Sequence, residues 1–252
     1  KRVTEYFAAR DNKPYTHVVV DEAQDLAIPE LRLLAAIVSY DPEALFFAGD
    51  LGQRIFQEPF SWKSLGVDVR GRSRTLKVNY RTSHQIRESA DKLLPSLVRD
   101  VDGVEQDRRG TVSVFNGPEP VIDTFSSEED EQDAVAAWIR QAMEAGVEAA
   151  EIGVFVRSNV QLDRARKAVN QTGQEVMELS ERREEAKGRV SIGTMHLAKG
   201  LEYKAVIVMA CDDEVLPLQS RVDDVADEAE LTDVFETERH LFYVASTRAR
   251  DR

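Results

Sequence analysis

A run of valines meets an acidic turn in residues 17–25, which read HVVVDEAQD. The three valines predict a strand buried on both faces, as in a parallel sheet flanked by helices, because a half-exposed strand would alternate. Ligands of such sheets collect at the carboxyl ends of the strands. The adjacent carboxylates of Asp21 and Glu22 therefore favour a nucleotide–metal site, where one carboxylate holds Mg²⁺ and the other activates water. The alternative is an acidic loop after a core strand.

The length and charge of the chain limit the number of domains and the kinds of protein to which it can belong. It has 252 residues, enough for one large domain or two modest ones. A formal net charge of -13 argues against a surface that attracts nucleic acid everywhere, although a narrow basic or aromatic track is compatible with it. No apolar run is long enough to cross a membrane, and the first residues lack the apolar centre of a signal peptide. We therefore expect a cytoplasmic protein without a membrane partner.

The content of metal-ligating and thiol residues is low. The single cysteine, Cys211, cannot form an internal disulfide, which is typical of proteins from a reducing compartment. Because it follows an apolar run, we expect a buried structural thiol. The four histidines and this cysteine are too scattered for a zinc site.

A strand, a helix and a second strand follow one another around the acidic turn. A helix is expected before residue 15, and another over residues 29–38, where Pro29 occupies the first turn. The second buried strand, Ala44–Ala48, leads to Asp50. Since both strands end in acid, we expect a P-loop-type α/β domain that brings these carboxylates to one edge of its sheet.

A loop rich in amide, guanidinium and aromatic groups follows the second strand. It contains Gln53, Arg54, Phe56, Phe60 and Trp62. Beyond the strand ends of an α/β domain, such side chains suit a polyanion and the stacking of bases. The alternative is that the rings pin the loop to the core, because aromatic side chains are usually buried.

The middle of the chain continues with a strand and a helix. A strand over residues 73–78 precedes the sequence NYRTS at residues 79–83. Ser83 is placed to cap a helix over residues 85–94. Charge and turn signals make residues 98–110 the best candidate for a mobile connection.

A second α/β block occupies the remainder. Its expected strands are residues 121–125, 152–156, 190–194 and 205–209, and its expected helices begin at Ser126 or Ser127 and at Gln161. The acidic residues 128–131 are interpreted as a solvated helix start without a ligand, because acid is favourable at that end of a helix. Two α/β layers in one chain predict a cleft between them.

Five stretches, taken together in this order, resemble the motifs of superfamily 1 DNA helicases of the UvrD/Rep type. They are the acidic turn, the Gln53 loop, NYR at 79–81, TMHLAKGLEY at 194–203 and ERHLFYVASTRAR at 238–250, with VFVRSN at 154–159 as a weaker match. The resemblance implies P-loop NTPase (RecA-like) domains of parallel sheets flanked by helices, with ATP between them. Residues 1–80 would be the C-terminal part of the first domain and residues 81–252 the complete second domain, with 98–110 as a linker-like segment.

The resemblance implies roles in ATP hydrolysis. Asp21 matches the ligand of Mg²⁺, and Glu22 matches the residue that activates the attacking water. Gln53, Arg81 and Arg248 match groups that contact the γ-phosphate, Arg248 from across the cleft, where positive charge stabilises the transition state.

The resemblance also implies nucleotide and DNA contacts. Tyr80 matches a ring that stacks on adenine, and Glu202 matches the acceptor for the ribose, with Gly200 in the same cofactor-binding motif. The stacking aromatic for DNA corresponds to Phe56, but the spacer at residues 57–59 departs from the pattern and makes Trp62 the better candidate.

Thr194 and His196 match the region that couples contact with the DNA strand to ATP. A structural histidine is the alternative for His196, because the residue type alone demands no DNA role.

Two parts of the family pattern are missing. The Walker A loop, Gly-x-x-x-x-Gly-Lys-Thr/Ser, occurs nowhere in the sequence. Without this loop, we expect the chain alone to bind ATP poorly and to hydrolyse it negligibly. Because the first residue is lysine and residues 248–252 look helical, we expect a C-terminal piece of a longer protein. The interval from Arg87 to Val190 has no space for the large accessory insertion of longer relatives. This puts conventional duplex unwinding in doubt and leaves translocation, or a role in a nuclease-like assembly, admissible.

The leading hypothesis is the C-terminal part of an ATP-dependent DNA helicase or translocase. The resemblance implies 3′ to 5′ movement, ATP and Mg²⁺ as cofactors, and a place in DNA repair, replication or recombination. Expected partners are single-stranded or partly duplex DNA, the missing N-terminal part of the same protein, and unidentified repair or nuclease proteins. Two alternatives stay open: a non-hydrolysing remnant that binds DNA or a partner, and a P-loop ATPase that acts on something other than nucleic acid.

Overall fold

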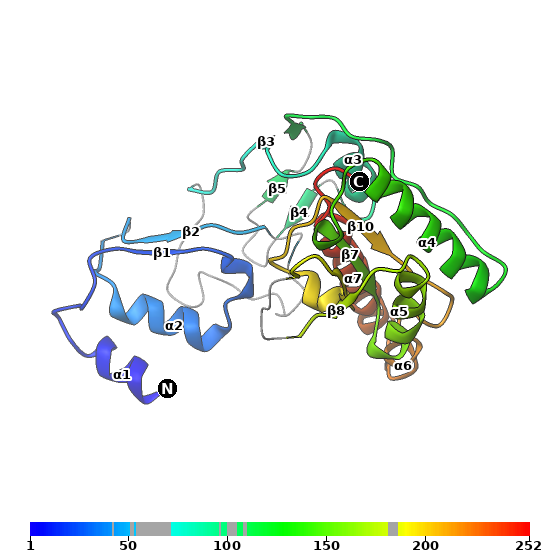
Figure 1. The fold of residues 1–252 in the computed structure, drawn as a ribbon. Coiled ribbons are helices and arrows are strands. Elements are labelled where there is room, and N and C mark those ends of the chain that lie inside the picture. Colours follow the sequence, from blue (N-terminus) through cyan, green and yellow to red (C-terminus); the bar gives the residue numbers. More distant parts are fainter. Residues whose placement is uncertain are drawn as a thin grey trace. The chain divides into compact units, whose positions relative to one another are not determined.

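The computed structural model of the protein describes residues 1–41, 43–50, 53, 72–95, 97–99, 105–107, 110–180 and 186–252. The chain divides into two compact units, one formed by Lys1–Leu76 and Pro95–Gly110 and the other by Lys77–Leu94 and Thr111–Arg252 (Figure 1). Each unit is described by itself below. The domain division after residue 80 stays a prediction.

The first unit contains two short parallel strands and two helices. Its elements are α1 (Arg2–Ala8), β1 (Val18–Val20), the 3-10 helix η1 (Ala23–Asp25), α2 (Ile28–Ile37) and β2 (Leu45–Phe47). β1 and β2 pair in parallel with Val18 opposite Leu45, as the valine run and the apolar run predict. Leu31 of α2 is fully buried against the inward residues Val20, Leu45 and Phe47.

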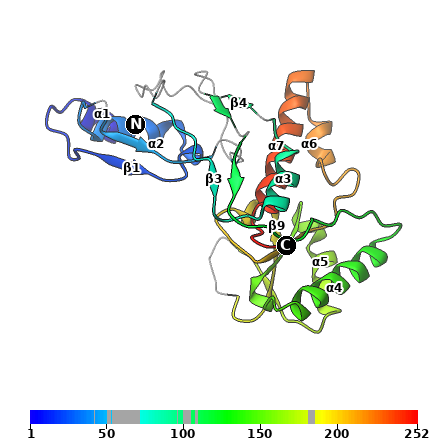
Figure 2. The same cartoon turned by 90° about the horizontal axis from the view of Figure 1, so that it is seen from above.

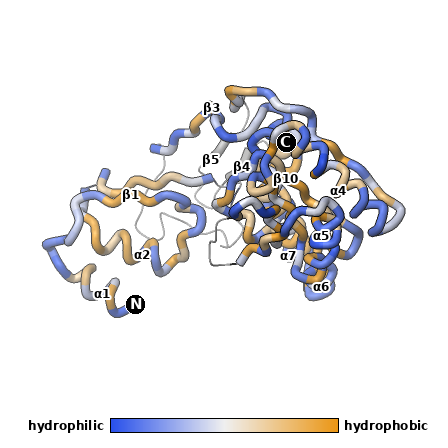
Figure 3. The backbone as a smooth tube through the Cα atoms, viewed as in Figure 1, coloured by the Kyte–Doolittle hydropathy of each residue, from blue (hydrophilic) through white to orange (hydrophobic). Residues whose placement is uncertain are grey.

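The strand pair is covered on one face only, within the described part of this unit. Val19 and Phe46, which lie opposite one another in the ladder, are 73% and 62% exposed. The prediction of burial on both faces is therefore wrong for β1 in this structure, although the whole strand is hydrophobic (Figure 3). The physical reason is that the described core residues all lie on the α2 side of the sheet.

The segment that the sequence predicts to be a mobile connection contains a small antiparallel pair. β4 (Leu97–Arg99) and β5 (Glu105–Asp107) pair with Leu97 opposite Asp107. Residues 100–104, 108 and 109 lie outside the described residues.

The second unit holds the larger sheet and most of the helices. Its elements are β3 (Val78–Asn79), α3 (His84–Asp91), β6 (Val112–Ser113), α4 (Glu128–Glu144), η4 (Ala149–Glu151), β7 (Ile152–Val156), η5 (Asn159–Gln161), α5 (Leu162–Asn170), β8 (Val176–Glu178), β9 (Val190–Thr194), η6 (Met195–Ala198), β10 (Ala205–Val208), α6 (Gln219–Asp223) and α7 (Glu228–Ser246). β3 pairs in parallel with β6. The main sheet is parallel throughout, in the order β10, β7, β9, β8.

The main sheet is buried on both faces. Every residue of β7 and of β9 is buried, which requires helices on both sides of the sheet. Figure 2 shows α4 and α5 on one side and α7 on the other. The core on the α4 and α5 side includes Ile139, Val154 and Ile192, each fully buried. This confirms the expected mixed α/β class with parallel sheets.

Three local predictions differ from the structure. Residues 121–125 form no strand, and Val121 and Ile122 are 65% and 87% exposed because no neighbouring strand pairs with them in the described chain. The strand expected over residues 73–78 is reduced to β3. Residues 248–252 are not helical: α7 ends at Ser246, and the chain runs beside β10, where Val206 N donates to the carbonyl of Arg252 at 2.8 Å.

The helix caps agree with the sequence only in part. The Ser127 hydroxyl accepts from Asp130 N at 3.1 Å, which confirms one expected cap. Ser83 occupies the cap position of α3, but its side chain makes no capping bond.

The prediction that the acidic start of α4 is fully solvated is wrong. Glu131 is buried, and its Oε1 accepts from Ala210 N at 2.9 Å. Its Oε2 lies 2.6 Å from Arg164 Nε as an ion pair, although the angles are not those of a hydrogen bond. Arg164 makes a second ion pair with Asp212 at 2.5 Å, so these side chains connect the starts of two helices to the end of β10.

Cys211 also differs from expectation, because the residue is exposed. The packing around its sulfur nevertheless raises the pKa of the thiol to about 12, and the charges of Glu131 and Asp212 add to this effect. Such a thiol carries almost no thiolate at neutral pH, which argues against a nucleophile. Separately, the described helices include none with the length and apolar character needed to cross a bilayer.

Replacement of Ile192 by alanine should destabilise the second unit. Its side chain is fully buried in β9, so we expect a loss of about 2–5 kcal/mol of unfolding free energy. Urea unfolding can be followed by the fluorescence of Trp138, which packs against this core, with Trp62 replaced by phenylalanine. Val160→Ala, at a position 84% exposed, is the control and should change stability by less than about 0.5 kcal/mol. Equal effects of the two substitutions would contradict the core assignment.

Candidate functional site

The acidic residues after β1 and β2 meet at one edge of the small sheet. The ladder continues past the strands, because Ala48 N donates to Val20 O and Ala23 N donates to Ala48 O, both at 2.8 Å. This brings Glu22 and Asp50 to the same edge, as the sequence predicts. Glu22 has a φ of 52°, in the left-handed region, and its N–H donates to Asp21 Oδ1 at 2.9 Å. Such a conformation costs about 1–2 kcal/mol for a residue with a side chain.

Gln24 connects the two acidic turns. Its Nε2 donates to Glu22 Oε2 at 2.5 Å, and its Oε1 accepts from Asp50 N at 3.1 Å. The residue is 3% exposed, so the amide satisfies two partners away from bulk water. The sequence analysis did not predict a role for Gln24. Its position two residues after the acidic pair is the one feature of the sequence that points to it.

Gly49 makes room for this amide. A Cβ at residue 49 would lie 2.3 Å from Gln24 Oε1. Gln53 extends the chain of contacts, because its Nε2 donates to Asp50 Oδ2 at 3.1 Å. The structure therefore gathers carboxylates and amides on one sheet edge, while the role of Gln53 at a phosphate stays a prediction. Phe56 and Trp62 lie outside the described residues.

The second unit presents a different set of groups around the turn after β3. Asn79 Oδ1 accepts from Arg81 N at 2.8 Å and from Thr82 N at 3.1 Å, so the side chain of Asn79 closes the turn. Tyr80, in this turn, is 75% exposed, so its ring is accessible for stacking on a ligand. Arg81 Nε forms an ion pair with Glu202 Oε1 at 2.6 Å.

The Glu202 segment lies beside the end of α7. Tyr203 N donates to Arg248 O at 3.0 Å, and Arg250 N donates to Tyr203 O at 2.8 Å. Arg248 itself is 2% exposed, with Nε donating to Val244 O at 3.0 Å. Gly200 adopts a φ of 75°, which explains a glycine at the turn that leads to Glu202. Within this unit, the predicted residues Arg81 and Glu202 are in contact and Arg248 adjoins them through its backbone.

Thr194 is the last residue of β9, and His196 follows it at the carboxyl edge of the main sheet. Thr194 is buried and is the residue before η6, in which His196 is half-buried. Burial lowers the pKa of His196 below its ordinary value, the charge of Arg157 lowers it further, and Glu238 opposes them. The imidazole is therefore neutral at pH 7, with one nitrogen able to donate and one able to accept.

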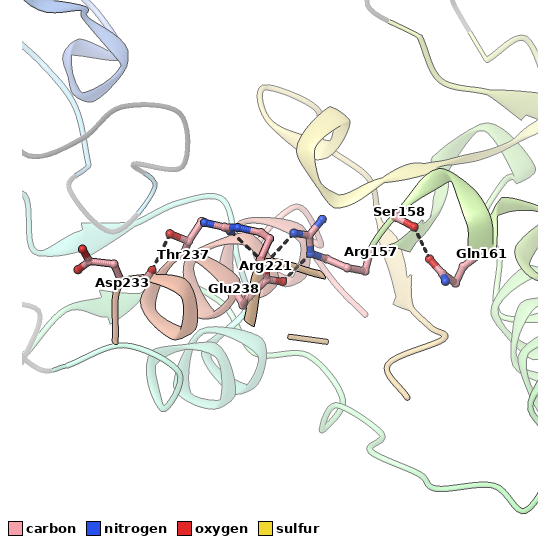
Figure 4. A network of polar contacts seen from close by, with 7 residues as sticks. All are labelled: Arg157, Ser158, Gln161, Arg221, Asp233, Thr237 and Glu238. Atoms are coloured by element: carbon pink, nitrogen blue, oxygen red, sulfur yellow. Dashed lines mark hydrogen bonds and ion pairs between the residues drawn. The ribbon is translucent and has the colours of Figure 1, made fainter. Parts of the chain in front are cut away.

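Two charged residues that act on the pKa of this histidine, Arg157 and Glu238, form a buried ion pair, which Figure 4 shows without the histidine. Arg157, at the end of β7, donates to Glu238 of α7 through Nε at 2.5 Å and through Nη2 at 2.6 Å. Both residues are about as buried as the core, at 5% and 4% exposure. Sequence reasoning placed them inside motif matches without a role, because a contact between residues so far apart in the chain leaves no periodic signal.

The site contains no self-sufficient metal centre in the part of the chain that the structure describes, since no group of three or more His, Cys, Asp or Glu side chains could hold a metal ion. Magnesium that binds together with a nucleotide needs fewer protein ligands, because phosphate oxygens and water complete a coordination shell that contains one or two carboxylates. Asp21, Glu22 and Asp50 supply oxygen donors of this kind at one edge. One or two of these carboxylates would suffice for Mg²⁺ that is bound together with a nucleotide, and its binding stays a prediction.

Comparison with known proteins agrees with the motif resemblance. Residues 169–252 match the UvrD-like helicase C-terminal domain. A "Probable DNA helicase" of Mycoplasma pneumoniae is 25% identical over 248 residues, which is 93% of this chain and 42% of that protein. The ATP-dependent DNA helicase Rep of Buchnera aphidicola is 38% identical over 66 residues, which is 26% of this chain and 9% of that protein.

One solved structure is also similar, the C-terminal domain of a possible DNA helicase from Lactobacillus plantarum. It has a TM-score of 0.39 and 20% identity, over 69% of this chain and 83% of that one. The chain thus spans less than half the length of the curated relatives that it matches. The predicted resemblance to helicases of the UvrD/Rep type is confirmed, and the family match covers residues 169–252.

Gly49→Ala should disconnect the two acidic turns. The added methyl group would occupy the place of Gln24 Oε1, so we expect a loss of about 1–3 kcal/mol in the first unit and faster hydrogen exchange of the Asp50 amide. Gln24→Ala should release the same amide. Because both changes break one contact, their effects on Asp50 exchange should not add in the double variant, and full additivity would contradict the proposed link.

Proposed function

We propose that the chain, whose residues 169–252 match the UvrD-like helicase C-terminal domain, is the C-terminal part of an ATP-dependent motor that moves along single-stranded DNA in the 3′ to 5′ direction. The observation that carries the proposal is the ion pair between Arg81 and Glu202, which joins the NYR turn to the matched domain. Two separate motifs, both attributed to nucleotide binding, are thereby in contact. The motor would consist of RecA-like domains of the P-loop class with ATP between them.

The first unit would supply the hydrolytic groups. Asp21 would hold Mg²⁺, Glu22 would orient and deprotonate water, and Gln53 would contact the γ-phosphate. Gln24 and its bonds to Glu22 and Asp50 support this assignment, because they fix the direction of the Glu22 carboxylate. When bound, Mg²⁺ would neutralise part of the phosphate charge.

The second unit would bind the base, ribose and phosphate from its own side. The exposed ring of Tyr80 suits stacking on adenine, and Glu202 suits the ribose hydroxyls. Arg81 and Arg248 would place positive charge on the γ-phosphate, where charge spreads over several oxygens during transfer. Arginines from different domains would hold the domains together until the γ-phosphate leaves, which converts hydrolysis into domain movement.

For DNA, the carboxyl edge of the main sheet is the proposed strand-facing surface in this unit. Thr194 and His196 lie together there, and the neutral imidazole can accept or donate a hydrogen bond. Phe56 and Trp62 would stack on bases from the first unit. DNA repair, replication or recombination in the cytoplasm is the proposed setting.

A non-hydrolysing remnant that binds DNA or a partner is the second candidate. These 252 residues contain no Walker A sequence, the loop that supplies the main phosphate cradle of P-loop enzymes, so the two candidates have to be separated in the full-length protein.

ATP hydrolysis by the full-length protein, measured with and without single-stranded DNA, separates these candidates. The motor should hydrolyse ATP faster with DNA, and Glu22→Gln should lower kcat by about 10²–10⁴-fold, as expected for loss of a general base. Arg81→Ala should lower kcat by about 10³–10⁵-fold. The side chain of Arg81 is half-exposed, so its truncation disturbs folding less than truncation of the buried Arg248.

The control is Glu129→Gln, a charge change at an exposed position of α4, which should leave hydrolysis unaltered. DNA binding without any hydrolysis would favour the remnant. Hydrolysis that ignores DNA would instead favour an ATPase with a different substrate.

A further inference from the structure

The ion pair between Arg157 and Glu238 is deeply buried, with side chains 6% and 4% exposed. The two hydrogen bonds are 2.5 and 2.6 Å long, and the contact is bidentate. Arg221 of α6 adds a third bond, from Nη1 to Glu238 Oε1 at 3.2 Å. Figure 4 shows both guanidinium groups meeting the one carboxylate. One carboxylate thus serves two arginines, which leaves an excess of one positive charge.

Such a pair is a costly way to obtain stability alone. Removing two charges from water costs several kcal/mol per ion, and well-packed apolar side chains are often as stable or more so. What a bidentate contact provides is geometry, since the planar guanidinium fixes both the distance and the orientation of the carboxylate. A positioning role therefore explains the pair better than a stabilising one.

The pair lies between the elements that carry the proposed DNA contact and those that carry the proposed nucleotide contact. Arg157 directly follows β7, and Glu238 lies in α7, which packs against η6. His196 lies in η6 and responds electrostatically to Arg157, Glu238 and Arg221. α7 ends at Ser246, so Arg248 follows directly from the helix that the pair holds.

We propose that the Arg157–Glu238 pair, together with Arg221, is a positioning element that fixes α7 to the end of β7. Because η6 packs against both β7 and α7, contact of a DNA strand near His196 is thereby transmitted to Arg248. The residues of the pair touch neither DNA nor nucleotide in this scheme. The inference rests on the proposed function, because it concerns how binding of DNA stimulates hydrolysis.

The test is DNA-stimulated ATP hydrolysis by the full-length protein carrying Arg157→Lys or Glu238→Gln. Lysine keeps the charge but loses the planar fork, and glutamine keeps the shape but loses the charge. We expect each to raise the single-stranded DNA concentration for half-maximal stimulation about tenfold and to lower the maximal stimulation, with the rate of hydrolysis in the absence of DNA changed by less than about twofold. Glu236→Gln, at an exposed position of the same helix, is the matched control and should behave like the parent protein.

Folding of each variant is checked by thermal unfolding, because removal of one partner of a buried pair can be strongly destabilising. If Glu238→Gln does not fold, the double variant Arg157→Gln with Glu238→Gln removes both charges and replaces it. Folded variants with the parent's half-saturation point would overturn the proposal.

A second measurement reports on the geometry without using activity. NMR titration of His196 in the full-length protein, assigned by loss of its signal in His196→Gln, should give opposite shifts for the two partners. Loss of the positive charge in Arg157→Gln should raise the pKa of His196, and loss of the negative charge in Glu238→Gln should lower it. General loosening would raise the pKa in both variants, because burial is the main cause of its low value, and that result would overturn the proposal.

The two measurements also separate the present inference from the function on which it rests. If the parent protein shows no stimulation by DNA, the proposed function fails and the transmission to Arg248 fails with it. Opposite shifts of the His196 pKa would then still establish the electrostatic effect of the pair on η6. If the parent is stimulated and the variants are too, with unchanged half-saturation, only the positioning role is wrong.

Discussion

Burial of a parallel sheet on both faces is the constraint on which the second unit depends. β7 and β9 expose none of their residues, so α4 and α5 on one side and α7 on the other are obligatory parts of the fold. Cover on both faces also fixes where the polar residues at the strand ends can lie. Arg157, Thr194 and His196 therefore emerge at one edge, and the buried ion pair to α7 is possible only because α7 must lie against the sheet.

The strands of this sheet could be predicted because their sequences are uninterrupted apolar runs. β7 and β9 have the expected bounds, and β10 ends one residue early. The same reasoning fails for residues 121–125, since an apolar run indicates only that a segment can form a strand, whereas pairing depends on a neighbour distant in sequence. β8 was missed for the opposite reason: Val176–Glu178 is short and mixed, and its pairing with β9 alone makes it a strand.

The candidate site was predicted through motifs, and this route finds residues that carry a recognisable residue type at a recognisable spacing. It selected Asp21 and Glu22, which are neighbours in the sequence, and also Arg81 and Glu202, which the structure brings into contact from distant segments. The roles of these residues stay predictions. This route could not find Gln24 or the contact of Glu131 with Ala210, because these depend on geometry after folding. Glu131 illustrates the limit, since its neighbours in the sequence suggest solvent and its neighbours in space form a buried contact.

The amide of Gln24 has a further consequence for the first unit. Its two ends are chemically different, and only one orientation places NH₂ against the Glu22 carboxylate and the carbonyl against the Asp50 N–H. A slip of one residue between β1 and β2 would move that N–H by about 3.3 Å, beyond the reach of the carbonyl. The orientation of the carboxylate at the end of one strand therefore depends on the register of the two strands. A force that slides β1 along β2 would change the orientation of the Glu22 carboxylate.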